Sequence, residues 1–418
     1  MDLFHILAII ITLTAIFSYV NHRYFRLPVT IGVMTISLIF SFLLILLNRV
    51  IPGLDKSAQL LLDSINFDRV LLHGMLSFLL FAGALNVNLQ NLAERKYSIA
   101  SLATVGTLIS IFIVGTATWL LLKLFNINLS FIYCLLFGAI ISPTDPIAVL
   151  SILKTTNAPK SLETKITGES LFNDGIGVVA FIVMLEIVLD SHGVSVGHII
   201  LLFVQETFGG IVAGLMMGYL AFLMLKSVDN YQVEILITLA LTTGGYALAD
   251  LLHISGPIAI VVAGLLVGNH GRLLAMSEKT RHHLDLFWEL VDEVLNAVLF
   301  VMIGMEILVL TFKHEYLLLC IIIIPITLLS RLVSISIPIK LLSFFRSFTP
   351  GVIRIMTWGG LRGGISVALA LSLPVSSQTS FEPSPERPLI LALTYSVVLF
   401  SILVQGLTIE KVVKKFCK

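Results

Sequence analysis

Hydrophobic residues fill this chain in long runs that short polar stretches separate. Most runs have about 20 residues, the length that a helix needs to cross roughly 30 Å of hydrocarbon. The runs and their breaks predict about thirteen membrane-spanning helices. The expected segments are residues 4–20, 29–48, 68–89, 98–122, 130–153, 163–189, 198–225, 232–251, 255–269, 284–310, 315–339, 351–373 and 388–408. The pattern therefore predicts an all-α polytopic membrane protein.

Composition supports this prediction, because 57% of the 418 residues are hydrophobic and 12% are charged. A soluble domain needs more charge to cover its surface. The net charge of +1 and the lack of a basic stripe with interleaved aromatics give no indication of a nucleic-acid partner. Cys134, Cys320 and Cys417 lack the spacing of a metal site or disulfide framework, which favours a packing role. Arg23 and Arg26 follow the first run, which indicates a retained span rather than a cleaved signal peptide.

The distribution of the 26 basic residues predicts the orientation. If thirteen helices are threaded through the membrane, most Lys and Arg residues fall in loops on one side. Cytoplasmic loops carry an excess of these residues. We therefore expect the N-terminus outside, the C-terminus in the cytoplasm and the chain in the cell membrane, in contact with its lipids.

The fifth expected span contains an acidic residue between two prolines. Asp145 stands in the sequence Ser-Pro-Thr-Asp-Pro at 142–146. Proline lacks a backbone donor and obstructs the helix, so carbonyls near Thr144 lose their helical partners. Irregular backbone survives at membrane depth only in buried or water-lined places, where its carbonyls can bind a cation. An ionisable residue at this depth is a functional candidate by default.

The sixth expected span places polar groups on two neighbouring helical faces. Ser170 and Asp174 are four residues apart, as are Glu169 and Asn173, so each pair shares a face. A hydroxyl beside a carboxylate suits a hard cation, which prefers oxygen ligands. Because Asp145 and Asp174 belong to adjacent spans, a cation site is favoured over polar contacts that only hold helices together.

The twelfth expected span surrounds an arginine with four glycines, in Trp-Gly-Gly-Leu-Arg-Gly-Gly-Ile-Ser. Arg362 keeps its proton, so it needs a buried partner, for which Glu169 and Asn173 are the candidates. The glycines indicate a helix that breaks or is approached closely. Two interpretations are open for Arg331: its side chain reaches the membrane interface, or it balances the charge of an acid such as Glu306.

Other polar residues of the expected spans have no matching broken helix. Acidic residues could line a water-filled funnel or an interface between subunits; they are Glu186, Glu206, Glu234 and Asp250. Histidines at span edges are interpreted as ordinary solvated side chains; they are His253, His282 and His283.

Taken together, these motifs closely resemble the sodium/proton antiporters of the cation:proton antiporter superfamily, in the electroneutral NhaP/NHE-type branch. The matching segments are residues 142–146, 168–175, 255–268 and 358–366. With the thirteen-span layout, the resemblance covers essentially the whole chain. The Asn-Asp pair and the Pro-Thr-Asp-Pro turn are specific, whereas glycine-rich strings alone are weak.

The resemblance implies inverted six-helix repeats with two broken, crossing helices. Scaffold helices at a homodimer interface would lie in residues 1–90 and, after a linking seventh helix, in 192–312. Moving core helices would lie in 91–191, with the ion site, and in 313–418, with a short cytoplasmic tail. The implied assembly is a homodimer.

The resemblance also implies roles for individual residues. The cation and proton site would consist of Asp145, Asp174, Ser170 and the Thr144 carbonyl, with Glu169 contributing through water. Asn173 and Arg362 would keep the site in shape. No resident cofactor is expected; the transported ions would be H+ and Na+, or Li+ or K+, which use the same ligand types.

A coupling mechanism follows from charge. A buried carboxylate is costly unless a proton or a cation neutralises it, so Asp174 beside Asp145 should hold one or the other. Because Asn173 is a neutral amide, one proton would exchange for one cation, which is electroneutral. The core would then carry the loaded site between the two faces by rocking against the scaffold.

Alternative functions remain at this stage. A K+/H+ antiporter of the same fold shares every ligand type. A cation channel or ion sensor would need a continuous pore. An intramembrane aspartyl protease could use two aspartates, but a Gly-x-Gly-Asp motif is missing from the sequence, as is a phosphate-binding loop for ATP-driven pumping.

Overall fold

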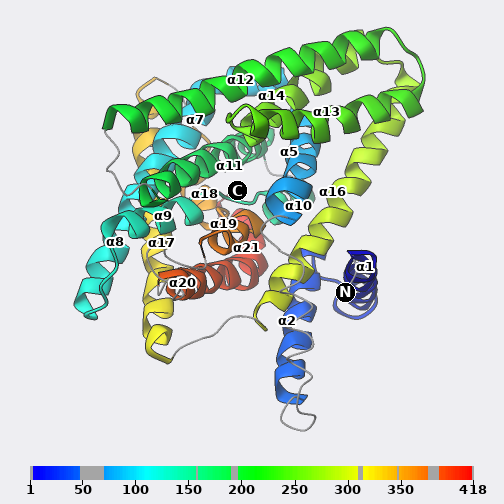
Figure 1. Cartoon of the computed structure of the whole chain (residues 1–418). Helices are drawn as coiled ribbons and strands as arrows, with labels where there is room; N and C mark the ends of the chain where they lie inside the picture. The colour runs from blue at the N-terminus through cyan, green and yellow to red at the C-terminus, as the bar shows by residue number, and fades with distance from the viewer. Residues whose placement is uncertain are drawn as a thin grey trace.

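The computed structural model describes residues 3–47, 70–156, 159–189, 196–308, 314–345, 348–374 and 386–416. Within these ranges the regular elements are helices, and strand pairing amounts to one isolated bridge between Asp145 and Leu361. The all-α prediction is therefore confirmed. Figure 1 shows a bundle in which α12 runs along the top and α1 lies at the edge.

The helices follow the hydrophobic runs. The longer ones are α1 (Leu3–Val20), α2 (Val29–Leu47), α5 (Leu76–Leu85), α8 (Thr107–Leu124), α9 (Phe131–Ile141), α10 (Ile147–Thr155), α11 (Lys160–Leu189), α12 (Val196–Lys226), α13 (Tyr231–Leu251), α14 (Gly256–Leu266), α16 (Glu278–Glu306), α17 (Leu317–Ser343), α18 (Val352–Trp358), α19 (Gly364–Leu371), α20 (Glu386–Phe400) and α21 (Gly406–Phe416). Shorter elements and π-helical or 3-10 turns connect or extend them: η1 (Asn21–Phe25), η2 (Val70–Met75), α6 (Leu89–Glu94), α7 (Lys96–Ser101), η3 (Leu102–Gly106), η4 (Val267–Gly271), α15 (Arg272–Leu274), η5 (His314–Tyr316) and η6 (Ser401–Gln405).

Nine helical runs among the described residues are long and apolar enough to cross a membrane. A helix lies at each of the expected segments, but four of these segments do not meet that criterion. The segment at 68–89 is short as described, the one at 284–310 is rich in charge, and those at 130–153 and 351–373 are interrupted. Residues 48, 68–69 and 309–310 of the expected spans lie outside the described ranges. About nine apolar spans are therefore counted where the sequence predicted about thirteen.

Packing brings the two interrupted segments together around α11. This helix contacts α9, α12, α14 and α19, and most of its central residues are buried. In Figure 1 α11 lies within the bundle, whereas α16 is a long helix that packs beside α1 and α2. Long apolar helices that meet on several sides bury α11, so its polar residues must find partners within the protein.

Two of the three cysteines occupy apolar packing positions. Cys134 and Cys320 are buried free thiols within one hydrophobic cluster, as the packing interpretation predicted. Cys417 lies outside the described residues.

Candidate cation-binding site

Two helices unwind at the same place. The first break separates α9 from α10, and the second separates α18 from α19. The Asp145 backbone N–H donates to the Leu361 carbonyl over 2.8 Å, which forms an antiparallel bridge between the two unwound stretches. The breaks predicted from the prolines and from the glycines are therefore confirmed, and they lie in contact.

Arg362 replaces the backbone donor that proline lacks. In a continuous helix the Ser142 carbonyl would accept from residue 146, but Pro146 has no N–H. One guanidinium nitrogen, Nη1 of Arg362, instead donates to the carbonyl oxygens of Ser142, over 2.6 Å, and Pro143, over 2.9 Å. A buried carbonyl without a partner is costly, so this contact stabilises the break.

The predicted direct pairing of Arg362 with Glu169 is wrong. Both Glu169 oxygens are held by Arg331, with Nη1 to Oε1 at 2.6 Å and Nη2 to Oε2 at 2.8 Å. The pair is buried, and its parallel two-bond geometry is the strong form of this interaction. Of the two interpretations of Arg331, the one in which it balances an acid is confirmed, although the acid of this ion pair is Glu169 of α11 and not Glu306.

Asn173 connects this ion pair to the first break. Its Nδ2 donates to Glu169 Oε1 over 3.2 Å and to Thr144 Oγ1 over 2.8 Å, while its Oδ1 accepts from the Thr144 N–H at 3.4 Å. Ser170 Oγ lies 3.2 Å from Thr144 Oγ1 and also donates to the Thr144 carbonyl. The expected meeting of the α11 polar face with the unwound segment is thus observed.

Glycine permits the close approach of Asp145 to the second break. A Cβ atom at Gly363 would lie 2.6 Å from Asp145 Oδ2 and 2.8 Å from Asp145 Cβ. Likewise, a Cβ at Gly177 would lie 2.5 Å from Cγ of Pro143, so α11 can lie against the first break. Part of the glycine pattern read from the sequence therefore serves contact between unwound backbone and its neighbours.

The two candidate carboxylates differ in their partners. Asp145 Oδ1 accepts from the N–H of Ile147, the first residue of α10, over 2.9 Å. Asp174 is 8% exposed, and its Oδ1 has no hydrogen-bond partner among the described residues. An unsatisfied buried carboxylate oxygen is unfavourable unless a proton or cation occupies the position beside it.

Asp145, Asp174 and Thr144 line one cavity of about 810 Å³. Its walls come from α5, α10, α11, α16 and α19, and it extends to the exposed Asn88, in the turn after α5, and the exposed Lys160, at the start of α11. Glu169 and Ser170 are not among the lining residues. The predicted roles of both residues in cation binding, with Glu169 acting through a water molecule, therefore stay predictions.

The sequence reasoning missed the acidic wall of this cavity. Residues of α16 at helical spacing line it, namely Asp285, Glu289, Asp292, Glu293 and Asn296. The spacing of these residues, four, seven, eight and eleven positions after the first, places them on one helical stripe. That stripe is visible in the sequence and explains why α16 is polar although it lies among apolar helices.

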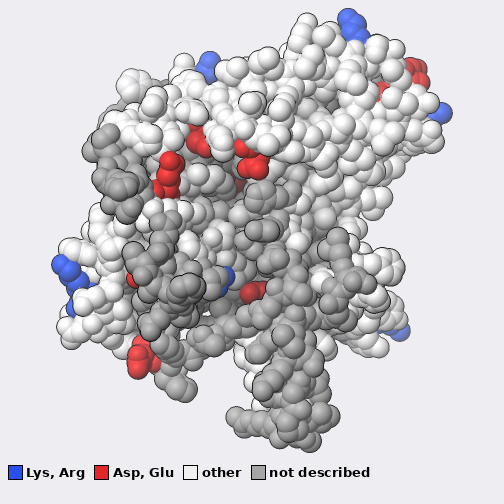
Figure 2. Space-filling model, in the orientation of Figure 1, with Lys and Arg blue, Asp and Glu red and all other residues white. Residues whose placement is uncertain are grey.

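Other intramembrane acids lie apart from this cavity. Glu206 of α12 interacts electrostatically with Glu186, Asp250 and His253, and none of the four lines the cavity as described. Glu234 is fully buried near the start of α13. On the face shown in Figure 2 most described side chains are uncharged, and several of the visible acidic ones gather below α12. These acids do not line the described cavity, and their interpretation as part of a water-filled funnel or of a subunit interface stays a prediction.

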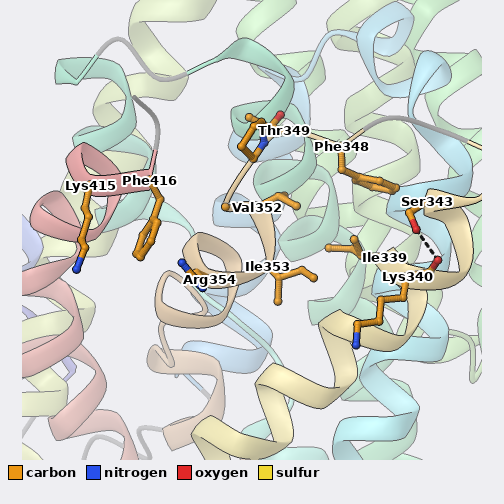
Figure 3. A pocket seen from close by; sticks show the side chains of 12 residues that line it. Ile339, Lys340, Ser343, Phe348, Thr349, Val352, Ile353, Arg354, Lys415 and Phe416 are labelled. Carbon is orange, nitrogen blue, oxygen red and sulfur yellow. Dashed lines mark hydrogen bonds between the residues drawn. The ribbon is translucent and has the colours of Figure 1, made fainter.

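A second cavity, of about 830 Å³, lies between α17, α18 and the end of α21 (Figure 3). Its described lining contains Lys340, Arg354 and Lys415 and no carboxylate. Such a lining repels cations. Of these two cavities, the one that Asp145 and Asp174 line has the carboxylates that a cation site needs.

Comparisons with known proteins identify the family of this chain. A family model described as sodium/hydrogen exchanger, transmembrane, matches residues 9–415. The chain is 50% identical over 415 residues to the Na(+)/H(+) antiporter NhaP of Pseudomonas aeruginosa, covering 98% of this chain and 96% of that protein. It is 34% identical over 370 residues to the antiporter NhaH of Halobacillus dabanensis, covering 87% of each.

A solved structure shares the fold. The sodium proton antiporter MjNhaP1 from Methanocaldococcus jannaschii aligns over 100% of both chains with a TM-score of 0.78 and 19% identity. At that identity the structural similarity supports the fold alone, while the sequence matches establish the protein family. The chain therefore belongs to the sodium/hydrogen exchanger family, as a multi-pass secondary transporter of its NhaP branch of Na+/H+ antiporters.

Proposed function

We propose that this antiporter exchanges one Na+ for one proton at a single site formed by Asp145 and Asp174. Ser170 and the Thr144 carbonyl would complete the oxygen ligands. The observation that carries the proposal is the buried, unpartnered Oδ1 of Asp174 in a cavity shared with Asp145. Oxygen ligands at a broken helix suit a hard monovalent cation.

Competition for this site would couple the two ions. Two neighbouring carboxylates in a poorly solvated site are unfavourable when both are bare, and either a proton or a cation relieves that charge. Binding of one ion then displaces the other. The empty pair carries two negative charges and is penalised when it crosses hydrocarbon, whereas the occupied pair carries one, which the nearby Arg362 can balance. This asymmetry would prevent uncoupled leak.

Stoichiometry would follow from the neutral amide at Asn173. Glu169 is charge-paired with Arg331, and the Asn173 amide does not titrate, so Asn173 adds no second exchangeable proton. The remaining pair would release one proton for each cation bound. The exchange is then electroneutral.

We therefore expect exchange to be insensitive to membrane potential. In proteoliposomes, sodium-driven proton flux should have the same rate, within about twofold, at zero potential and at about 100 mV of either sign, which is worth about 2.3 kcal/mol for one net charge. A strong, sign-dependent change in rate would contradict one-for-one exchange. The same assay with Li+ and K+ measures selectivity and tests the K+/H+ alternative.

Alternating access would use the division into core and scaffold. We infer that residues 91–191 and 313–418 form the moving core, and 1–90 with 192–312 the scaffold and linking helix, within thirteen spans arranged as inverted six-helix repeats. The cavity supports this division, since α10, α11 and α19 form one wall and α5 and α16 the other. Rocking of one wall against the other would close it.

Orientation and assembly follow the same inference. The cavity extends to Lys160 at the start of α11, and basic residues at the ends of spans favour the cytoplasm. It would then open to the cytoplasm, with the N-terminus outside. The apolar windows of α1 and α12 are each 28% buried, which leaves surface for lipid and for the scaffold contact of a homodimer.

A further inference from the structure

The innermost part of the acidic α16 wall lies next to the candidate site. Leu299 of α16 contacts the position of Gly364: a Cβ there would lie 2.5 Å from Leu299 Cδ1. The preceding residue, Gly363, is the one packed against Asp145. Asn296 and Asp292 lie one and two helical turns before Leu299 and line the same cavity. Asp292 and Asp145 are close enough to interact electrostatically.

Asn296 has one buried oxygen without a partner. Its Nδ2 donates to the Asp292 carbonyl oxygen over 2.9 Å and to Asp292 Oδ1 over 3.1 Å. A backbone carbonyl can only accept, so the amide nitrogen must face it, and this fixes the orientation of the side chain. Asn296 Oδ1 therefore points elsewhere; the residue is 3% exposed, and this atom has no hydrogen-bond partner among the described residues.

Such an arrangement calls for a donor or a cation. Leaving a buried acceptor unpaired is unfavourable. A carboxylate and an amide oxygen on one helical face are ligands that a hard cation prefers. Repulsion between Asp292 and Asp145 further favours a positive ion beside them. Asp285, Glu289 and Glu293 contribute charge to the same wall but lack a comparable buried, unpartnered oxygen in the described structure.

We propose that Asp292 and Asn296 form a second, weaker monovalent-cation site on the α16 wall, which a cation occupies between solvent and the Asp145–Asp174 site. The inference rests on the proposed function, because it assumes that transported cations enter through this cavity. The α16 site would capture cations from solvent, while Asp145 and Asp174 would couple cation binding to proton release.

Thallium(I), an electron-dense monovalent cation, locates such sites directly. A structure determined in excess Tl+ should show one peak beside Asp174 and a second beside Asn296 Oδ1 and Asp292. In Asp292→Asn protein the second peak should weaken while the first remains. Glu293→Gln is the matched control, because it removes one charge from the same wall without altering the Asp292–Asn296 pair, and it should retain both peaks. A Tl+ peak at Asp174 with none at Asn296 under saturating conditions overturns the proposal.

Transport measurements test the assignment of the α16 site separately from the assignment of the Asp145–Asp174 site. In oriented proteoliposomes, Asp292→Asn should raise the half-saturating sodium concentration on the cavity side about fivefold and leave the maximal rate within about twofold. Glu293→Gln should shift half-saturation by less than about twofold. Unchanged half-saturation in folded Asp292→Asn protein contradicts the α16 site while the main site stands. Full exchange by Asp174→Asn would instead refute the proposed function.

Discussion

Replacing Asp174 with asparagine is expected to lower sodium/proton exchange at least about a hundredfold. The amide keeps the size of the side chain but cannot carry the negative charge or the exchangeable proton, so neither ion is bound competitively. The protein should still fold, because Asp174 Oδ1 makes no hydrogen bond within the described structure. Proteoliposome flux across a pH gradient measures the loss.

The control for this variant is Glu186→Gln. It removes a carboxylate from the same helix, but Glu186 is exposed and does not line the cavity as described. Exchange by this variant should stay within about twofold of the unaltered protein, as for a substitution outside the site. If Asp174→Asn protein, correctly folded by gel filtration and thermal midpoint, exchanged at the normal rate, the site would be assigned to the wrong residue.

Arg331→Ala should destabilise the protein by about 3 kcal/mol, because it leaves Glu169 charged, buried and unpaired. Glu169 and Arg331 have side chains that are 2% and 8% exposed, so solvent screens the pair little. We expect a lowered thermal midpoint and a low yield of folded protein. The double variant Glu169→Gln with Arg331→Met, which removes both charges, should recover most of the stability.

Lys340→Ala is the matched control for the arginine variant. Lys340 lies on the same helix, is exposed and forms no described ion pair, so its loss should change stability by less than about 0.5 kcal/mol. Equal thermal midpoints for the Arg331→Ala protein and the unaltered protein would show that the buried pair does not hold α11 and α17 together. A double variant as unstable as Arg331→Ala would contradict the explanation by an unpaired charge.

Local rules predicted much of the site from the sequence. Pro143 and Pro146 indicated where α9 would end, and the glycines around Arg362 indicated the second break. The four-residue spacing on α11 correctly paired Glu169 with Asn173, whereas Ser170 contacts Thr144 and its grouping with Asp174 stays a prediction. These features depend on backbone chemistry within a few residues, which the sequence contains explicitly.

Long-range partners were not predictable in the same way. Glu169 and Arg331 are 162 positions apart, and the sequence offered two arginines for one acid without a distance to choose between them. Arg362 was assigned an anionic partner by charge, whereas the structure gives it carbonyls that the prolines had freed. The polar stripe of α16 was present as a pattern, but the cavity it lines depends on how α5, α10 and α19 pack against it.

The span count shows the same limit. Length and hydropathy identify continuous apolar helices, but an ion site in a membrane requires interrupted ones, as at 142–146 and 359–363. The charged wall of α16 lowers its apparent hydropathy for a local reason, since its charges face the cavity. Segments next to the site are therefore the ones that a hydropathy count represents least well.

The most direct test of the central claim, that Na+ and H+ take turns at the Asp145–Asp174 site, is proton release on sodium binding. Purified protein in weakly buffered detergent solution, at a pH where the site is protonated, should release about one proton per Na+ bound. Asp174→Asn protein should release none. Apparent sodium affinity should also weaken about tenfold for each pH unit of further acidification. Sodium binding with no proton released, or affinity independent of pH, would contradict the account.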